Sequence, residues 1–320
     1  MGERVVPSVE EIEYAADELD PVFADSPLLT GTTLDDLGTR IAVKVETLNP
    51  IRSFKGRGAM TWMRQVGAGA PGVVCASAGN FGQGLAYAAR RAGARCDVFV
   101  GESANPAKVD AIRRLGAQVE VGGADYDAAI DTARSFAADN DLRFVQDGRD
   151  PWISAGAATM AVETTRAGVV PDVAVVPVGN SALILGIARW LRHQSPGVRI
   201  VGVCAEAAPA PALSWRRGAP VAAQANTVAD GIGIGAPFPE SVAAMGDLVD
   251  AMVLVSEPEL TAASRQVAAD LGLLVEAAGV AGVAALRADP EAYEGRTVFT
   301  PLCGAHLPPD AIQWGPGWRL

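Results

Sequence analysis

The 320-residue chain has few of the residues that histidine or metal chemistry requires. It contains only two histidines and four cysteines, and no two cysteines form a CxxC pair. A zinc ribbon or a thioredoxin-type site is therefore not expected. A Ser-His-Asp triad would have to use His193 or His306, and His193 lies in an Arg-containing segment that resembles an exposed helix end. We predict no metal site.

Long apolar runs and an excess of basic residues are also missing. No stretch approaches the roughly 18 consecutive apolar residues that a membrane span needs, and the acidic N-terminal segment lacks the apolar region of a secretory signal. The net charge of −11 argues against nucleic acid, because phosphate backbones are bound through clustered Lys and Arg. We expect neither a membrane nor a nucleic acid as partner. We also expect a cytoplasmic location, where cysteines stay reduced.

Short apolar segments rich in β-branched residues alternate with Ala-rich segments of helical period. Six of them read as buried strands: residues 41–46, 72–77, 96–100, 119–121, 172–178 and 200–206. Several of the intervening helical segments end in glycine, which suits a helix C-cap followed by a turn. Alternating strands and helices with nearly continuous apolar strands predict an α/β fold whose parallel sheets are buried on both faces.

The pattern also predicts the domain organisation. Residues 72–145 form a βαβαβα series, which is followed by a helix around residues 155–168 and then by a second parallel series. We predict two interleaved parallel-sheet domains. The small domain comprises residues 72–148, and the large domain comprises residues 1–71 and 149–320.

Lys55 is one of three lysines in the chain, and it lies between a predicted strand and a predicted helix. The preceding Ser53 can cap that helix. A lysine in the first turn faces the positive end of the helix dipole, which disfavours its ammonium form, and burial acts in the same direction. A neutral amine is the form that makes a Schiff base with an aldehyde. Without further signals, Lys55 could equally be a surface lysine near a helix start.

Two glycine-rich turns each follow a strand and open a helix. In the first, CASAGNFGQGL (75–85), a carboxylate would fit beside Ser77 and the amides of Gly79 and Asn80. In the second, PVGNSAL (177–183), the amides of residues 179–183 and the Ser181 hydroxyl could hold a phosphate monoester. Amides at a helix N-terminus form such anion sites. Neither turn carries a dinucleotide or P-loop motif, and each alone could be an ordinary tight turn.

Six segments taken together resemble a known family. SFKGRGA (53–59), SAGNFGQG (77–84), PVGNSAL (177–183), ADGI (229–232), EAAGVAG (276–282) and LCGAH (302–306) occur in the order seen in fold-type II enzymes that use pyridoxal 5′-phosphate (PLP). The chain most resembles the threonine and serine dehydratase (ammonia-lyase) group, which includes serine racemase, over about residues 20–307. The resemblance implies a tryptophan synthase β-like fold, a PLP cofactor, an amino-acid substrate and a homodimer.

The resemblance also implies roles for the cofactor-binding residues. Lys55 is expected to form the Schiff base and to act as the general base at Cα. Phe54 is expected near the cofactor ring, and Asn80 is expected to hydrogen-bond the ring 3′-oxygen. Glu276 is expected in the wall behind the ring, and Cys303 is expected to face the pyridine nitrogen. The phosphate is expected to bind the loop Gly179, Asn180, Ser181, Ala182 and Leu183.

The substrate-binding residues follow from the same likeness. The substrate carboxylate is expected at Ser77, Gly79 and Asn80, and the flanking Ala78 and Phe81 are expected in the substrate pocket. Ser77 is also expected to take part in catalysis. The implied reaction is β-elimination, which converts L-threonine or L-serine to a 2-oxo acid and ammonia.

Some positions depart from the family pattern and leave alternatives open. Ala78 stands where racemase members carry a second serine, and Phe81 stands where dehydratases often have His. The phosphate loop reads Gly179-Asn180-Ser181-Ala182 instead of four glycines, and Cys204 replaces the Glu of a cation site found in several relatives. A β-replacement enzyme or an amino-acid racemase is therefore the alternative. A third hypothesis is a non-catalytic PLP-binding protein, against which the intact Lys55, Asn80 and Cys303 argue.

Overall fold

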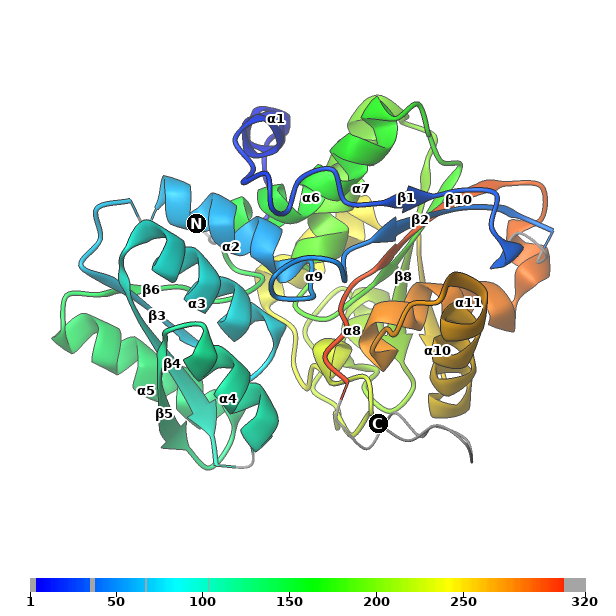
Figure 1. Ribbon diagram of the computed structural model, residues 1–320. Coiled ribbons are helices and arrows are strands. Elements are labelled where there is room, and N and C mark those ends of the chain that lie inside the picture. Colours follow the sequence, from blue (N-terminus) through cyan, green and yellow to red (C-terminus); the bar gives the residue numbers. More distant parts are fainter. Residues whose placement is uncertain (1–3, 35–37, 67, 103, 308–320) are drawn as a thin grey trace, which may run out of the picture.

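The computed structural model of the chain describes residues 4–34, 38–66, 68–102 and 104–307 (Figure 1). It has two lobes, each built around a sheet with helices on both faces. The strands are β1 (Leu28–Leu29), β2 (Arg40–Val45), β3 (Gly72–Ala76), β4 (Arg95–Gly101), β5 (Gln118–Gly123), β6 (Arg143–Phe144), β7 (Val173–Pro177), β8 (Arg199–Ala205), β9 (Ala251–Val255) and β10 (Thr297–Leu302).

Eleven α-helices connect and cover these strands in the part of the chain that the structure describes. They are α1 (Val9–Asp17), α2 (Lys55–Gln65), α3 (Asn80–Ala92), α4 (Pro106–Arg114), α5 (Tyr126–Asp139), α6 (Pro151–Arg166), α7 (Ala182–Gln194), α8 (Ala210–Arg217), α9 (Pro239–Leu248), α10 (Glu257–Leu271) and α11 (Ala281–Ala288). Short 3₁₀ turns lie at Asp230–Ile232, Ala277–Val280 and Pro290–Tyr293.

The strand order confirms the predicted fold class. One sheet has the order β1-β2-β10-β7-β8-β9 and the other β5-β4-β3-β6. Among these described strands all pairings are parallel except that of β1 with β2, which is antiparallel. The smaller sheet is formed by a segment that lies between β2 and β7 in the chain, so the two sheets are interleaved. The domain limits at residues 71/72 and 148/149 remain a prediction.

The core of the large lobe consists of two layers, one on each face of its sheet. In β7, Val173 and Val175 pack with α10 and α11, whereas Ala174 and Val176 pack with α6 and α7. All five residues of this strand are buried. Two-sided burial is the reason why the strand reads as a continuous apolar run.

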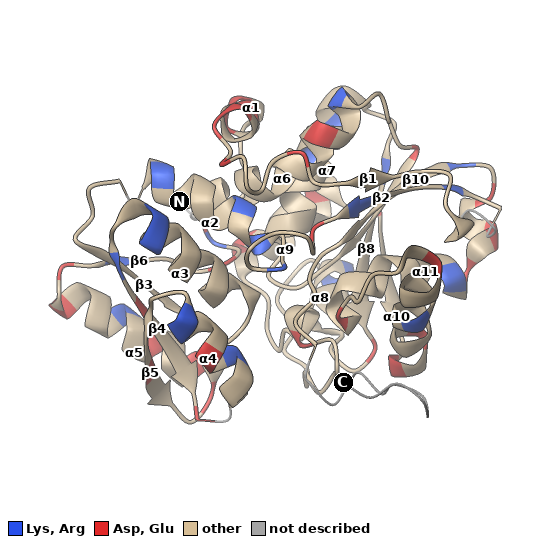
Figure 2. Ribbon diagram, in the orientation of Figure 1, with Lys and Arg blue, Asp and Glu red and all other residues tan. Residues whose placement is uncertain are grey.

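The small sheet is covered in the same way. On one face Val73, Cys75 and Val98 pack against α2, α3 and α4, and on the other Val74 and Phe99 pack against α5. β5 is the edge strand, and it is more exposed than its neighbours. Charged residues of both signs are spread over the helices and loops in the view of Figure 2.

Local sequence signals fix several helix ends. Ser8 and Glu11 form a capping box at α1, and Ser256 and Glu259 form another at α10. The predicted glycine C-cap is found at Gly93, which adopts φ 69° after α3. These caps satisfy backbone groups that a helix end leaves without partners. No helix in the described parts of the chain is both long and apolar enough to span a bilayer.

Candidate active site

A cavity of about 830 Å³ contains all the residues that the sequence analysis assigned to the site. Its lining includes Phe54, Lys55, Ser77, Ala78, Gly79, Asn80, Phe81, Gly179, Asn180, Ser181, Ala182, Leu183, Glu276 and Cys303. These residues come from both lobes and from segments far apart in the chain. The carboxyl ends of parallel strands meet at one edge of a sheet, which explains why the glycine-rich turns converge there.

The helices of the sequence motifs begin at this cavity. Lys55 is the first residue of α2, Asn80 of α3 and Ala182 of α7, and all three line the cavity. Helix N-termini carry free N–H groups and a partial positive charge. Their convergence makes the cavity suited to ligands with anionic groups, such as a carboxylate and a phosphate.

The start of α2 differs in one detail from the prediction. The N-cap is Phe54, which makes no side-chain capping bond. The Ser53 hydroxyl lies one residue earlier and accepts a hydrogen bond from the Lys55 amide at 3.3 Å. Ser53 is itself held by Asn49, whose side chain accepts from the Ser53 amide at 3.2 Å. The loop before Lys55 is thus fixed by local hydrogen bonds.

The amine of Lys55 lies against a carboxylate that the sequence analysis did not identify. Lys55 Nζ lies 2.6 Å from Asp147 Oδ2 and 4.8 Å from the centre of the Phe54 ring. The Lys55 side chain is 15% exposed and that of Asp147 is 10% exposed. Asp147 supplies a negative charge that the argument from the helix end and burial did not include. The only sequence signal was an acidic residue soon after a strand, and that strand, β6, has two residues and no readable period.

Asn80 and Glu276 form a hydrogen-bonded pair behind the cavity. Glu276 Oε1 accepts from Asn80 Nδ2 at 2.7 Å, and Oε2 accepts from the His306 amide at 2.9 Å. Burial raises the pKa of the Glu276 carboxyl, while these two donors lower it. Gly304 permits the pair, because a Cβ there would lie 2.4 Å from Glu276 Oε1.

Cys303 directly precedes that glycine, at the end of β10. Its thiol is buried, and its sulfur lies 3.7 Å from the carbonyl oxygen of Pro301. Burial raises the pKa of the thiol, with smaller contributions from Glu46 and Glu276. The backbone carbonyl of Cys303 accepts from the Phe54 amide at 3.0 Å, which ties the end of β10 to the start of α2. Cys303 therefore presents a neutral group to the cavity.

The loop between β7 and α7 has the shape of a small cup. Ser181 adopts φ 70°, a left-handed conformation that is uncommon for a residue other than glycine. Gly179 leaves no room for a side chain, since a Cβ would lie 2.9 Å from the carbonyl oxygen of Gly231. The Ser181 hydroxyl lies 3.4 Å from Met245 Sδ. The hydroxyl therefore has a competing partner in the protein, and the backbone amides are the stronger candidates for holding an anion.

The first glycine-rich turn contains a similar internal contact. The Ser77 hydroxyl accepts from the Gly79 amide at 3.2 Å. Phe81 is 4% exposed and packs in the core of the small lobe with Leu85 and Ile112. Phe81 thus presents an apolar surface at the cavity where the family pattern often has His. The roles assigned to these residues remain predictions.

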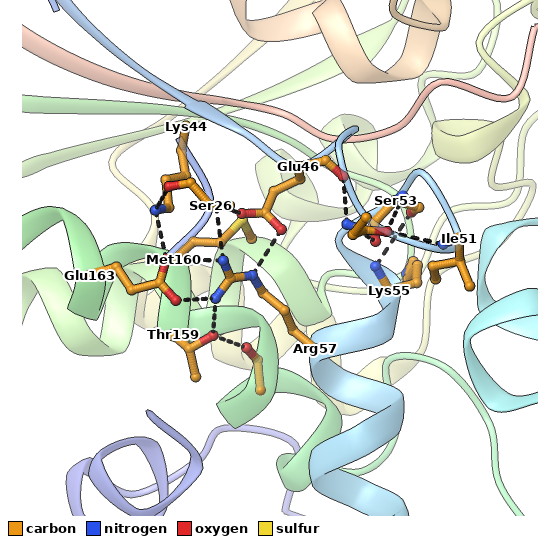
Figure 3. Close-up of polar contacts among 12 residues, drawn as sticks. Ser26, Lys44, Glu46, Ile51, Ser53, Lys55, Arg57, Thr159, Met160 and Glu163 are labelled. Atoms are coloured by element: carbon orange, nitrogen blue, oxygen red, sulfur yellow. Dashed lines mark hydrogen bonds and ion pairs between the residues drawn. The ribbon is translucent and has the colours of Figure 1, made fainter. Parts of the chain in front are cut away.

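A buried ion cluster lies behind the first turn of α2 (Figure 3). Arg57 is 0% exposed; it binds Glu46 at 2.8 Å and Glu163 at 2.6 Å. Lys44 binds the same Glu163 at 2.6 Å, so two cations and two carboxylates balance. Further hydrogen bonds join Arg57 to the hydroxyls of Thr159 and Ser26. The sequence analysis did not anticipate this cluster, because charged residues are seldom fully buried.

Among the described residues no three His, Cys, Asp or Glu side chains are grouped so as to hold a metal ion. Further charged groups at the cavity are Lys108, which pairs with Asp230, and the acidic residues Asp125 and Asp127. The fold and the cavity thus define an α/β protein in which a lysine amine and converging helix N-termini share one ligand site.

Comparison with known proteins gives the same result. Residues 19–304 match the model of the family described as "Pyridoxal-phosphate dependent enzyme". The chain belongs to this family and is therefore PLP-dependent. It is 39% identical to an L-threonine ammonia-lyase of Geobacter sulfurreducens over 79% of its own length and 63% of that protein. It is 32% identical to an L-threonine ammonia-lyase of Thermotoga maritima, covering 96% of this chain and 77% of the relative.

Solved structures have the same fold. A threonine deaminase whose source is given as T.th. superimposes with a TM-score of 0.88 at 29% identity, covering 94% of this chain and 99% of that one. The processed threonine deaminase isoform 2 of Solanum lycopersicum gives a TM-score of 0.87 at 27% identity, covering 97% and 94%. The maize serine racemase, at 21% identity and a TM-score of 0.90, shares the fold. The predictions of family and PLP fold type II are confirmed.

Proposed function

We propose that the protein is an ammonia-lyase that converts L-threonine to 2-oxobutanoate and ammonium, or L-serine to pyruvate and ammonium. The observation that carries the proposal is the cavity in which Lys55, Asn80 and Cys303 meet the start of α7. The printed names of the Geobacter and Thermotoga relatives support it. The chain spans 63% of the length of the Geobacter protein, and the proposal concerns the part that it shares.

The residues of the cavity fit a phosphorylated pyridine aldehyde. The start of α7 offers amides for the phosphate beside Gly179, where a Cβ would collide with the carbonyl of Gly231. Phe54 and Cys303 provide apolar and neutral surface for the ring, and Lys55 offers the amine. When bound, the cofactor supplies an aldehyde and a ring that withdraws electrons from Cα of the substrate.

The chain's own groups would then perform three tasks. The amides at the start of α3, with Ser77, hold and orient the substrate carboxylate. Lys55 Nζ takes up the proton of Cα. The pair of Asn80 and Glu276 fixes the ring face, because the two side chains lie 2.7 Å apart in a buried setting. A neutral thiol at position 303 suits elimination, since it does not protonate the ring nitrogen as a carboxylic acid would.

An amino-acid racemase is the second candidate, because serine racemases share the fold. Inversion at Cα needs an acid–base group on each face of the substrate. Ala78 lines the cavity at the position expected to face Lys55 across the ring, and its methyl group cannot exchange a proton. This residue favours elimination. The proposal further includes a homodimer and a cytoplasmic location, the latter supported by four cysteines that are all free and buried.

The test is a direct assay of the products. PLP-loaded protein mixed with L-threonine or L-serine should release the 2-oxo acid, and it should show a visible absorbance band from the lysine–cofactor bond. Lys55→Ala should lose the band and reduce turnover by at least about 10³-fold. Lys108→Ala is the matched control, because Lys108 lines the same cavity and should leave the band in place. Absence of 2-oxo acid from both substrates would refute the proposal, and formation of D-serine instead would favour the racemase.

A further inference from the structure

Asp147 has one oxygen engaged and one oxygen open in the cavity. The residue is 8% exposed and lines the cavity wall. Its Oδ2 accepts a hydrogen bond from Lys55 Nζ at 2.6 Å. Its Oδ1 is buried and has no hydrogen-bond partner among the described residues. The carboxylate is thus held by Lys55 on one side and lacks a donor on the other.

A buried carboxylate oxygen without a donor is costly, by about 1–3 kcal/mol or more. The missing donor must therefore come from a molecule that enters the cavity. The charged groups along the cavity wall do not supply one: Asp125 and Asp127 are acceptors, and Lys108 is paired with Asp230. An N–H donor with positive charge would suit Oδ1 best. The ammonium group of an amino acid has both properties.

We propose that Asp147 is a positioning residue for the exchange of two amines, with Oδ2 holding Lys55 Nζ and Oδ1 receiving the amino group of the incoming substrate. This inference rests on the function proposed above. In the exchange, the bond from Nζ to the aldehyde-derived carbon of the cofactor breaks as the substrate nitrogen bonds to that carbon. Two protons pass from the substrate ammonium to Nζ, so atoms, electrons and charge balance.

The two oxygens of one carboxylate are well placed for this task. They are bonded to the same carbon atom, so two amines bound to them lie side by side and within reach of one reacting carbon. Holding both reactants together converts an encounter in solution into a step within the complex. A carboxylate also offsets the positive charge that the two amines share. The 2.6 Å contact then keeps the released lysine amine in place for its later use at Cα.

Amine exchange can be measured without turnover. Glycine and L-alanine have no leaving group at Cβ, so the change that they cause in the visible band of the PLP-loaded protein reports binding and exchange alone. In Asp147→Asn the band should still form with Lys55. The rate constant for exchange with glycine, followed by stopped-flow absorbance, should fall at least about 10-fold.

The matched control is Asp97→Asn. Asp97 is 0% exposed and pairs with Arg95 at 2.7 Å, and it does not line the cavity. Its replacement removes a buried, paired carboxylate of the same lobe. Exchange in this variant should stay within about twofold of the wild-type rate.

A second variant separates positioning from support of the fold. In Asp147→Ala, added formate can occupy the vacated space and restore a carboxylate. Exchange should then recover with increasing formate, whereas Asp97→Ala should not respond. Should the Asn variant fail to fold, this rescue alone decides: recovery supports the proposal and its absence overturns it.

The outcomes distinguish the inference from the function on which it rests. Wild-type exchange rates in Asp147→Asn, with the band and the 2-oxo acid products intact, would overturn the role of Asp147 and leave the lyase standing. A wild-type protein that forms no bond between Lys55 and PLP would overturn both.

Discussion

Two cations two residues apart on α2 have opposite surroundings. Arg57 points into the interior, away from Lys55 (Figure 3), and meets two carboxylates and two hydroxyls. Lys55 lines the cavity and meets a single carboxylate, one oxygen of which has no partner among the described residues. Both lie in the first turn of the same helix, so the contrast arises from what the rest of the chain brings to each side.

The difference separates a structural ion pair from a functional one. Every donor direction of the Arg57 guanidinium can be satisfied by fixed acceptors, so this network holds one geometry. The Lys55 amine must change partners if it is to bind a cofactor and later move a proton. A pair with an open oxygen permits that change. The saturated cluster therefore keeps the first turn of α2 in place while the unsaturated pair reacts.

The strongest way to break this comparison is Arg57→Met. The change leaves the buried Glu46 and the nearly buried Glu163 without their shared cation. Removing one partner of a buried ion pair costs about 3–5 kcal/mol. We expect a loss of this size in the free energy of unfolding, measured by urea denaturation.

Arg64→Met is the control on the same helix. Arg64 is 45% exposed and pairs with Glu18, which is 51% exposed. Exposed pairs contribute about 0–1 kcal/mol, so this variant should remain close to the wild type. Equal stability of the Arg57 and Arg64 variants would show that the cluster does not hold the helix.

The sequence predicted much of the fold, because two-sided burial gives parallel strands a readable apolar run. All six predicted strands are present, and most of their ends agree to within one or two residues. β1 and β6 were not predicted because two residues have no period. The helix at α6 begins at Pro151, before the predicted start at residue 155, since Asp150 caps it and Pro151 suits its first position.

The site was predictable wherever it coincides with a glycine-rich turn or a family motif. Asp147 and the Arg57 cluster were missed for a different reason. Their significance depends on distant partners, Lys55 at 92 positions from Asp147 and Glu163 at 106 positions from Arg57. Such pairings follow from the packing of α2 against α6 and of the two lobes around the cavity, which no local pattern encodes.

A smaller effect is expected on the cavity side, from Gly304→Ala. The new Cβ would lie 2.4 Å from Glu276 Oε1 and 3.0 Å from Asn80 Nδ2, so the hydrogen bond between these side chains must break. A hydrogen bond to a charged group is worth about 1.5–3 kcal/mol, which corresponds to about 10-fold or more in an equilibrium constant. If Asn80 holds the cofactor ring, PLP affinity should fall by that factor, as measured by titration of the visible band.

Gly246→Ala serves as the control for that substitution. Nothing lies within 4 Å of a Cβ at Gly246, near the end of α9. PLP affinity should be unchanged in this variant. An unchanged affinity in Gly304→Ala as well would mean that the pair of Asn80 and Glu276 does not support the cofactor.

Glu276 is the intermediate case in the comparison, and it gives the smallest expected effect. It is a buried carboxyl held by two neutral donors, and burial raises its pKa above the ordinary value of 4.5. As the pH rises above 4.5, the unfolded chain loses this proton before the folded protein does. The folded state then binds more protons, so this group makes stability fall with rising pH until the folded carboxyl also ionises.

Glu276→Gln removes this titration but carries a pH-independent loss of one hydrogen bond. The difference in unfolding free energy, wild type minus variant, should therefore decrease from pH 4.5 upward and then level off. Urea denaturation of both proteins at a series of pH values measures that difference. A difference that stays constant with pH would show that the two donors fully offset the burial, and that Glu276 behaves like the saturated carboxylates around Arg57.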